Sequence, residues 1–305
     1  HLPALLGCLR RGVGDPAVAL YLHENQLTHP VGPRDRLDEG LALANWLSMA
    51  AADRVLVNSG SHLAELRAAV PVLLGRALDH GHTHRLEEVW SRTEVLPVGV
   101  ELSGIAPDGH APPPEPTVVW NHRWDREKRA DRLFAALHHL ADEGVAFRLA
   151  LAGENLRIDP QEFDRIRARL GDRVTHVGAL DLDGYHRLLA ASDVTVSTAD
   201  HETFGIAAVE AMAAGCVPLL PDRLSYPEIV PDRFHDAVLY DDGALRDRLR
   251  DVLTDLPAAR ARVDGLATAV RRWDWSVVAP HYDAVLAELA ERSEGPERSD
   301  RATSR

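Results

Sequence analysis

The sequence predicts an α/β protein with two Rossmann-like domains, each built on a parallel β-sheet. Apolar segments of strand length alternate with helical segments, a pattern typical of parallel sheets covered by helices. The 305 residues suffice for two domains of ordinary size, and a proline-rich polar segment near the middle favours a hinge. We therefore expect a first domain at 1–104, a linker at 105–116, a second domain at 117–275, a last helix at 276–291 and a disordered tail at 292–305.

The first domain is expected to be an incomplete Rossmann-like sheet. Its expected elements are a strand at 17–22, a helix at 37–51, a strand at 54–58, a helix from Ser61 and a strand at 94–100. Ser59 or Ser61 can cap the second helix. A Rossmann-like half-domain normally begins with a strand and then a glycine-rich turn, but the weak Arg11–Gly14 stretch precedes the strand. Several N-terminal strands are therefore expected to be missing, as in a fragment.

The second domain is expected to be doubly wound. Expected strands lie at 117–120, 146–152, 174–177, 193–197 and 217–220. Expected helices lie at 129–142, 160–170, 183–191, 204–214, 244–253 and 258–272.

The composition favours a soluble globular protein without a nucleic-acid-coating surface. Asp and Glu total 47 against 34 Lys and Arg, for a formal net charge of −13, whereas phosphate binding needs Lys and Arg. A local basic patch can still coexist with this balance. No apolar run reaches the ~20 residues of a membrane span, and no signal peptide is visible. Cys8 and Cys216 argue against a disulfide framework, so we expect a reducing cytoplasm.

The stretch from His201 to Glu228, HETFGIAAVEAMAAGCVPLLPDRLSYPE, is expected to carry the functional site. Its apolar residues predict a buried helix from Phe204 to Ala214, with Thr203 as its cap and Gly215 as a left-handed C-cap. The first-turn amides, including that of Gly205, lack intrahelical acceptors and lie at the positive end of the helix dipole. A glycine there lets a ligand approach the backbone, so the stretch predicts a site for a diphosphate or a sugar hydroxyl.

Glu210 is a carboxylate in the middle of this apolar helix and needs partners that offset its desolvation. Ribose hydroxyls would serve. Alternatively, Glu210 pairs with a core arginine or caps a neighbouring backbone segment. A second carboxylate, Glu202, lies eight positions upstream, which favours the ligand-binding interpretation.

These residues carry a family resemblance. The Glu-x7-Glu pattern in HETFGIAAVEAMAAGCVPLL resembles retaining glycosyltransferases of the GT-B fold, the GT4-like group. Three further stretches, YLHENQLTHP from Tyr21, VVWNHRWDREK from Val118 and PDRLSYPEIVP from Pro221, resemble the tRNA-queuosine mannosyltransferase family. The resemblance covers roughly residues 17–290. It implies two Rossmann-like domains that face each other across a cleft, with the last helix crossing back to the first domain, although simple packing on its own domain remains open.

The resemblance also implies roles for particular residues. Arg123 and Lys128 would hold the donor diphosphate together with the start of the helix at Phe204 and Gly205. Glu202, Thr203 and Glu210 would bind the donor sugar and ribose. His23, with Glu202, would be catalytic by stabilising an oxocarbenium-like transition state. Glu24 and Asn25 would orient His23 or the acceptor, and Glu228 would bind hydroxyls or be a simple loop carboxylate.

Two other polar clusters suggest a metal, and we expect none. His80, His82 and His84 lie in an Arg/Glu-rich segment without a suitably spaced carboxylate, which is typical of a solvated loop. Asp181 and Asp183 match a metal-binding DxD only superficially, because they precede an expected helix that aspartates cap well.

Three hypotheses about function follow. The first is transfer of mannose from GDP-mannose to queuosine in tRNA, without a metal, as the resemblance implies. The second keeps the glycosyltransferase class but changes the acceptor to a lipid or small glycoside, which the acidic balance favours. The third is a nucleotide-sugar or nucleic-acid binding module without turnover, which the missing N-terminal strands favour.

Overall fold

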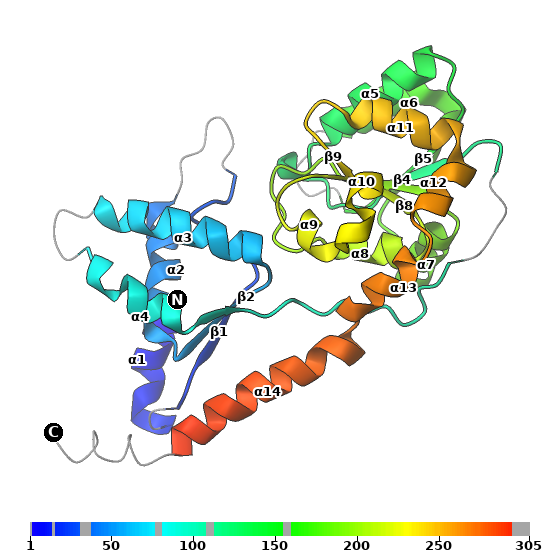
Figure 1. Ribbon diagram of the computed structural model, residues 1–305. Coiled ribbons are helices and arrows are strands. Elements are labelled where there is room, and N and C mark those ends of the chain that lie inside the picture. The colour runs from blue at the N-terminus through cyan, green and yellow to red at the C-terminus, as the bar shows by residue number, and fades with distance from the viewer. Residues whose placement is uncertain are drawn as a thin grey trace. The chain divides into compact units, whose positions relative to one another are not determined.

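A computed structural model of the chain describes residues 2–13, 16–30, 38–76, 81–107, 113–154 and 160–294. The chain forms two compact units (Figure 1). The first comprises His1–Val98 and Val278–Arg305, and the second comprises Gly99–Val277. Both contain parallel sheets with helices, which confirms the predicted α/β class. Among the described residues, no helix is both long and apolar enough to span a membrane.

The first unit is a three-stranded parallel sheet with helices. Its strands β1 (Ala19–Leu22), β2 (Arg54–Val57) and β3 (Thr93–Val95) pair in the order β1-β2-β3. Its helices before β3 are α1 (Leu2–Val13), α2 (Glu39–Ala51), α3 (Gly60–Gly75) and α4 (Leu86–Ser91), the last preceded by a 3-10 turn at Thr83–Arg85. The hydroxyl of Ser59 caps α3 by accepting the amide of His62 at 3.1 Å.

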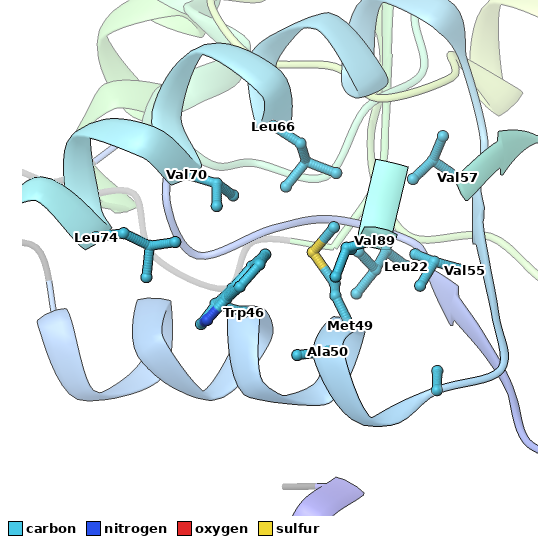
Figure 2. Packing of buried hydrophobic residues seen from close by; sticks show 11 residues of the cluster. Leu22, Trp46, Met49, Ala50, Val55, Val57, Leu66, Val70, Leu74 and Val89 are labelled. Carbon is cyan, nitrogen blue, oxygen red and sulfur yellow. The ribbon is translucent and has the colours of Figure 1, made fainter. Parts of the chain in front are cut away.

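The core of the first unit lies between this sheet and its helices (Figure 2). Trp46 and Met49 from α2 face Leu66 and Val70 from α3, and all four are fully buried.

The expected strand 94–100 is shorter than predicted. The strand that forms is Thr93–Val95. Val100 belongs to the second unit, where it forms an isolated parallel bridge with Asp274.

Helix α14 (Trp275–Glu294) supplies most of the remaining part of the first unit, from Val278 onward. The ring of its Tyr282 stacks on Tyr21 of β1 with the centroids 5.7 Å apart. Arg54 of β2 donates to Glu288 at 3.1 Å. These contacts tie the two ends of the chain into one unit. The predicted tail from 292 lies almost wholly outside the described residues.

The second unit is a six-stranded parallel sheet in the order β6-β5-β4-β7-β8-β9. The strands are β4 (Thr117–Trp120), β5 (Arg148–Ala152), β6 (Val174–Gly178), β7 (Val194–Val196), β8 (Val217–Pro221) and β9 (Leu239–Tyr240). In chain order within this unit the arrangement is 3-2-1-4-5-6, the doubly wound Rossmann order. The direction of winding reverses between β4 and β7, and open α/β sheets bind ligands at the carboxyl end of such a switch point.

Helices connect these strands, as the sequence predicts. They are α5 (Ala130–Asp142), α6 (Pro160–Leu170), α7 (Leu182–Ala190), α8 (Ile206–Ala213), α9 (Tyr226–Ile229), α10 (His235–Val238), α11 (Leu245–Thr254), α12 (Leu256–Arg262) and α13 (Leu266–Ala269). Four 3-10 turns lie at Arg126–Lys128, Gly171–Arg173, Asp232–Phe234 and Val270–Trp273. Helices α5 and α11 lie side by side (Figure 1), joined by an ion pair between Arg250 and Glu143.

Two expectations about these helices are wrong. The helix expected at 258–272 is divided into α12, α13 and a 3-10 turn, because Gly265 adopts a left-handed φ of 80°. The loop expected at Glu228 is instead the short helix α9, with Pro227 in its first turn where proline is well tolerated.

Candidate active site

Two loops at the switch point of the second unit hold most of the predicted donor residues. One loop follows β4 and runs from Asn121 to Lys128; the other follows β7 and runs from Ser197 to Gly205. Gly153, at the end of β5, lets the first loop pass: a Cβ on this residue would lie 2.0 Å from the carbonyl oxygen of His122. Gly153 is not among the predicted site residues, although a glycine directly after a buried strand is a signal of close backbone approach.

Lys128 and Glu202 form an ion pair between these two loops. The Nζ of Lys128 lies 3.2 Å from Oε2 of Glu202 and also donates to the carbonyl oxygen of His201 at 3.0 Å. Both side chains are largely shielded, at 10% and 16% exposure. The resemblance implies a diphosphate at Lys128, and the anions beside it in this structure are the carboxylates of Glu202 and, at 3.6 Å, of Glu127. The structure therefore brings together two of the predicted donor-binding residues.

The charges around this pair favour the ionised carboxylate. Burial opposes ionisation of Glu202, but the charge of Lys128 and the neighbouring His122 outweigh it and lower the pKa of Glu202. His122 is itself buried, and its ring meets Trp120 edge-on at 5.3 Å. Burial and the charge of Lys128 lower the pKa of His122 from 6.5 to about 4. A neutral imidazole thus lies beside a charged pair at neutral pH.

Helix α8 begins later than predicted and without the predicted cap. Its first residue is Ile206, its N-cap is Gly205 with a φ of 102°, and no side chain caps it. The assignment of Thr203 as the cap is wrong, because the left-handed Gly205 separates Thr203 from the first helical residue. Gly205 also packs closely, since a Cβ there would lie 3.0 Å from Cδ1 of Ile229. The first-turn amides of α8 keep the polarity expected of an anion site.

Glu210 lies on α8 and is half-buried. Its Oε2 accepts a hydrogen bond from the hydroxyl of Tyr185 on α7 at 2.7 Å. Burial raises the pKa of Glu210, and the hydrogen bond from Tyr185 opposes that rise. The alternatives of a core arginine or a backbone segment as partner are wrong, because the partner in the structure is a phenol 25 residues upstream. Tyr185 is not among the predicted site residues, because its spacing from Glu210 follows no pattern that the sequence reveals.

The other predicted residues of the second unit lie in the segments that follow strands β4, β7 and β8. Arg123 is exposed in the loop after β4. Phe204 is buried, and its ring meets Trp273 edge-on at 5.4 Å. Glu228 is exposed on α9. Next to it, Tyr226 is fully buried, with its hydroxyl 2.5 Å from Oγ of Ser197, so it supports the loop after β7.

The predicted residues of the first unit follow β1. His23 is exposed, its ring lies 4.7 Å from that of Tyr21, and its carbonyl oxygen accepts from Asn58 at 2.8 Å. Glu24 is exposed beside it. Asn25 is fully buried and shapes the turn, because its Oδ1 accepts the amides of Leu27 at 3.0 Å and Thr28 at 2.9 Å.

The residues that suggested a metal have structural partners. The Oδ1 of Asp181 accepts the amide of Gly184 at 2.8 Å and caps α7, which confirms the capping interpretation. The rings of His82 and His84 meet edge-on at 6.3 Å. His80 lies outside the described residues.

The fold defined by these units is that of the GT-B glycosyltransferases. A sucrose-phosphate synthase from Thermosynechococcus elongatus matches with a TM-score of 0.73 and 24% identity over 95% of this chain and 72% of that chain. The crystal structure of WaaG, a glycosyltransferase involved in lipopolysaccharide biosynthesis, matches with a TM-score of 0.65 and 17% identity over 92% of this chain and 80% of that chain. These likenesses confirm the predicted fold.

The chain belongs to the family of glycosyl transferases group 1, whose model matches residues 106–264. Residues 1–100 match the model of the tRNA-queuosine alpha-mannosyltransferase N-terminal region. These matches confirm the family resemblance that the motifs indicate.

Two curated relatives are similar over part of their length. A tRNA-queuosine alpha-mannosyltransferase from Drosophila melanogaster is 34% identical over 221 residues, which cover 70% of this chain and 59% of that protein. A GDP-mannose-dependent alpha-(1-6)-phosphatidylinositol dimannoside mannosyltransferase from Mycobacterium tuberculosis (strain ATCC 25177 / H37Ra) is 33% identical over 155 residues, which cover 46% of this chain and 38% of that protein. The chain thus spans only part of the length of either relative.

Proposed function

We propose that the chain transfers mannose from GDP-mannose to queuosine in tRNA, in the cytoplasm and with retention of configuration. The observation that carries this proposal is the match of residues 1–100 to the tRNA-queuosine alpha-mannosyltransferase N-terminal model. The second unit belongs to a family of transferases with varied acceptors, including the phosphatidylinositol mannoside named by one relative. The first unit is therefore the part that favours a tRNA acceptor.

The donor diphosphate is assigned to Lys128, Arg123 and the first turn of α8 at Phe204 and Gly205. The pairing of Lys128 with Glu202 supports this assignment, because it shows a shielded cation whose partner is another predicted donor residue. A diphosphate entering here competes with Glu202 for Lys128. Its arrival releases Glu202 to accept hydrogen bonds from hydroxyls of the transferred sugar, with Thr203 beside it.

The transfer itself needs no protein base in this proposal. The acceptor hydroxyl oxygen forms a bond to the anomeric carbon on the face from which the nucleotide leaves, and the bond between that carbon and the diphosphate oxygen breaks. The leaving diphosphate takes the electron pair and then the proton of the acceptor hydroxyl. Lys128 and Arg123 stabilise the charge that develops on the diphosphate, which a metal does in other transferases. We therefore propose a metal-independent reaction.

The residues of the first unit and of α9 complete the proposal. His23 is assigned to the transferred sugar, where it stabilises positive charge developing at the anomeric centre. Glu24 and Glu228, both exposed, are assigned to the acceptor side. Asn25 is assigned there through the turn that it holds, because its side-chain oxygen is already bonded to backbone amides of that turn.

A transfer assay tests the proposal directly. Queuosine-containing tRNA is incubated with the chain and GDP-mannose, and nucleosides are then analysed by mass spectrometry. A hexose-sized increase on queuosine is expected, with none on tRNA that lacks queuosine and none with UDP-glucose. No increase with wild-type protein that binds GDP-mannose would overturn the transfer function and leave the binding module.

A lipid or small glycoside acceptor is the second candidate. The net charge of −13 favours it, because tRNA binding requires local positive charge on an acidic protein. A tRNA shift assay across salt concentrations separates the two candidates. Binding that weakens steeply with salt supports the tRNA acceptor, whereas no binding at low salt supports the second candidate.

A further inference from the structure

A chain of four side chains leads from the centre of the sheet in the second unit to Glu210. Thr195 of β7 donates through Oγ1 to Oδ1 of Asn121 at 3.3 Å. Asn121, directly after β4, donates through Nδ2 to the hydroxyl of Tyr185 at 2.9 Å. Tyr185 of α7 then donates to Oε2 of Glu210 at 2.7 Å. Three of these four residues have no role in the function proposed above.

The direction of this chain is determined by chemistry. Nδ2 of Asn121 also donates to the carbonyl oxygen of Ala207 at 2.7 Å, and a carbonyl oxygen can only accept. The atom facing Tyr185 is therefore an amide donor, so the phenol oxygen accepts there. The single proton of that hydroxyl must then point to Glu210. The Tyr185 hydroxyl is thus held as a donor to the carboxylate.

The neighbourhood makes this arrangement rigid. Asn121 is 6% exposed and Thr195 is 1% exposed, so few water molecules can compete for their hydrogen bonds. Asn121 also ties the site together, because it bonds both Tyr185 on α7 and the first turn of α8 at Ala207. The carboxylate of Glu210 therefore cannot rotate freely without breaking a charge-assisted hydrogen bond.

We propose that Tyr185 is a positioning residue that orients the Glu210 carboxylate toward the ribose of the donor nucleotide. The inference rests on the proposed function, in which Glu210 binds ribose. Among the described residues, Tyr185 is the side chain that donates a hydrogen bond to this carboxylate, and it does so at Oε2. The other oxygen, Oε1, therefore faces the ribose hydroxyls in this proposal. Tyr185 also opposes protonation of Glu210, which keeps the carboxylate an acceptor for both hydroxyls.

The test compares two ligands and two isosteric variants. GDP and 2′,3′-dideoxy-GDP are titrated calorimetrically into wild type, Tyr185→Phe and Tyr240→Phe. Tyr240 is the matched control: it is a buried tyrosine of the same unit whose hydroxyl donates to the carbonyl oxygen of Ser197 at 2.6 Å. We expect Tyr185→Phe to bind GDP about tenfold more weakly and dideoxy-GDP as wild type does. Tyr240→Phe removes a hydrogen bond to the loop after β7 but none to Glu210, so it should leave the ratio of the two affinities as in wild type.

The pH profile provides a readout that a merely structural role would not move. In Tyr185→Phe the acidic limb of GDP binding should shift to higher pH, because the carboxylate loses the hydrogen bond that stabilises its ionised form. Dideoxy-GDP should show no such shift, and it reports on titration of the phosphates alone.

The outcomes separate the inference from the proposed function. Equal losses for both ligands in Tyr185→Phe, or no loss for either, would overturn the positioning role while the wild type still binds GDP. A wild type that binds neither ligand would overturn the proposed function and the inference with it. If Tyr185→Phe does not fold, Thr195→Val replaces it, with a smaller loss of about twofold expected for GDP alone; unchanged GDP binding in that variant would count against the inference.

Discussion

The loop after β7 and helix α8 each carry one glutamate of the Glu-x7-Glu pattern, and they stabilise it in opposite ways. Glu202, in the loop, is paired with the ammonium of Lys128, and its pKa is lowered. Glu210, on the helix, accepts a hydrogen bond from the neutral phenol of Tyr185, and burial raises its pKa although this hydrogen bond opposes the rise. The same residue type at a fixed spacing therefore serves two electrostatic purposes. In the proposed function Glu202 exchanges partners when the donor diphosphate binds Lys128, whereas Glu210 already has an oriented carboxylate.

The largest effect that tests this comparison is expected at Lys128. Lys128→Met should lower turnover about 10²–10³-fold, because charge on the departing diphosphate loses a shielded cation. It should also lower the free energy of unfolding by about 3 kcal/mol, since the shielded carboxylates of Glu202 and Glu127 both lose this ammonium. Steady-state kinetics and urea denaturation measure the two quantities. Arg126→Met, at an exposed position in the same 3-10 turn, is the control and should change neither.

A double variant separates these two effects of Lys128. Lys128→Met combined with Glu202→Gln removes one of the two carboxylate charges that lose Lys128, so stability should return partly toward that of wild type while turnover stays below that of Glu202→Gln alone. If turnover rose to that of Glu202→Gln together with the gain in stability, Lys128 would act only through folding, and its assignment to the diphosphate would be wrong.

The second effect is the pH dependence of the stability that comes from His122, the buried neighbour of Glu202. Between 6.5 and about 4, His122 binds a proton in the unfolded chain that it does not bind in the folded protein. The free energy of unfolding therefore falls as the pH decreases through this window, by about 3 kcal/mol from this residue. His122→Gln should lose less stability than wild type over the same window in urea denaturation. His139→Gln, at an exposed position, should follow wild type, and identical slopes for His122→Gln would contradict the buried neutral imidazole.

The third effect concerns Glu210. Glu210→Ala should weaken donor binding by about 2 kcal/mol, because the ribose hydroxyls lose an oriented charged acceptor. Calorimetric titration with GDP-mannose measures the affinity. Glu143→Ala, which removes an exposed carboxylate paired with Arg250, should bind the donor as wild type does. An unchanged donor affinity in Glu210→Ala would show that the ribose assignment is wrong.

The smallest effect is expected at the start of α7, the helix that carries Tyr185. Asp181→Ala should lower the free energy of unfolding by about 1 kcal/mol, because the amide of Gly184 loses its capping carboxylate. Asp183→Ala, within the first turn, should cost only about 0.5 kcal/mol, through the helix dipole. Thermal denaturation of the two variants measures the difference, and equal losses would argue against the cap.

Much of the second unit follows from local sequence. The strand 117–120 has the predicted bounds, and Gly215 adopts the left-handed conformation expected after α8, with a φ of 93°. These features depend on neighbouring residues, so a short window of sequence contains their cause. The predicted start of α8 at Phe204 is wrong because a short window of sequence does not contain its cause. Thr203 is a good capping residue locally, but the packing of Gly205 on Ile229 and its left-handed backbone belong to the folded unit.

The sequence by itself determined the alternation of strands and helices, the position of most of the predicted donor residues after strands, and the family to which the chain belongs. Only the tertiary structure decided which partner each glutamate takes, and it also decided that α14 from Val278 onward belongs with the first unit. The physical reason is the range of the interactions. Periodicity and capping act within a few residues, whereas Lys128 meets Glu202 across 74 residues of chain and Tyr185 meets Glu210 across 25.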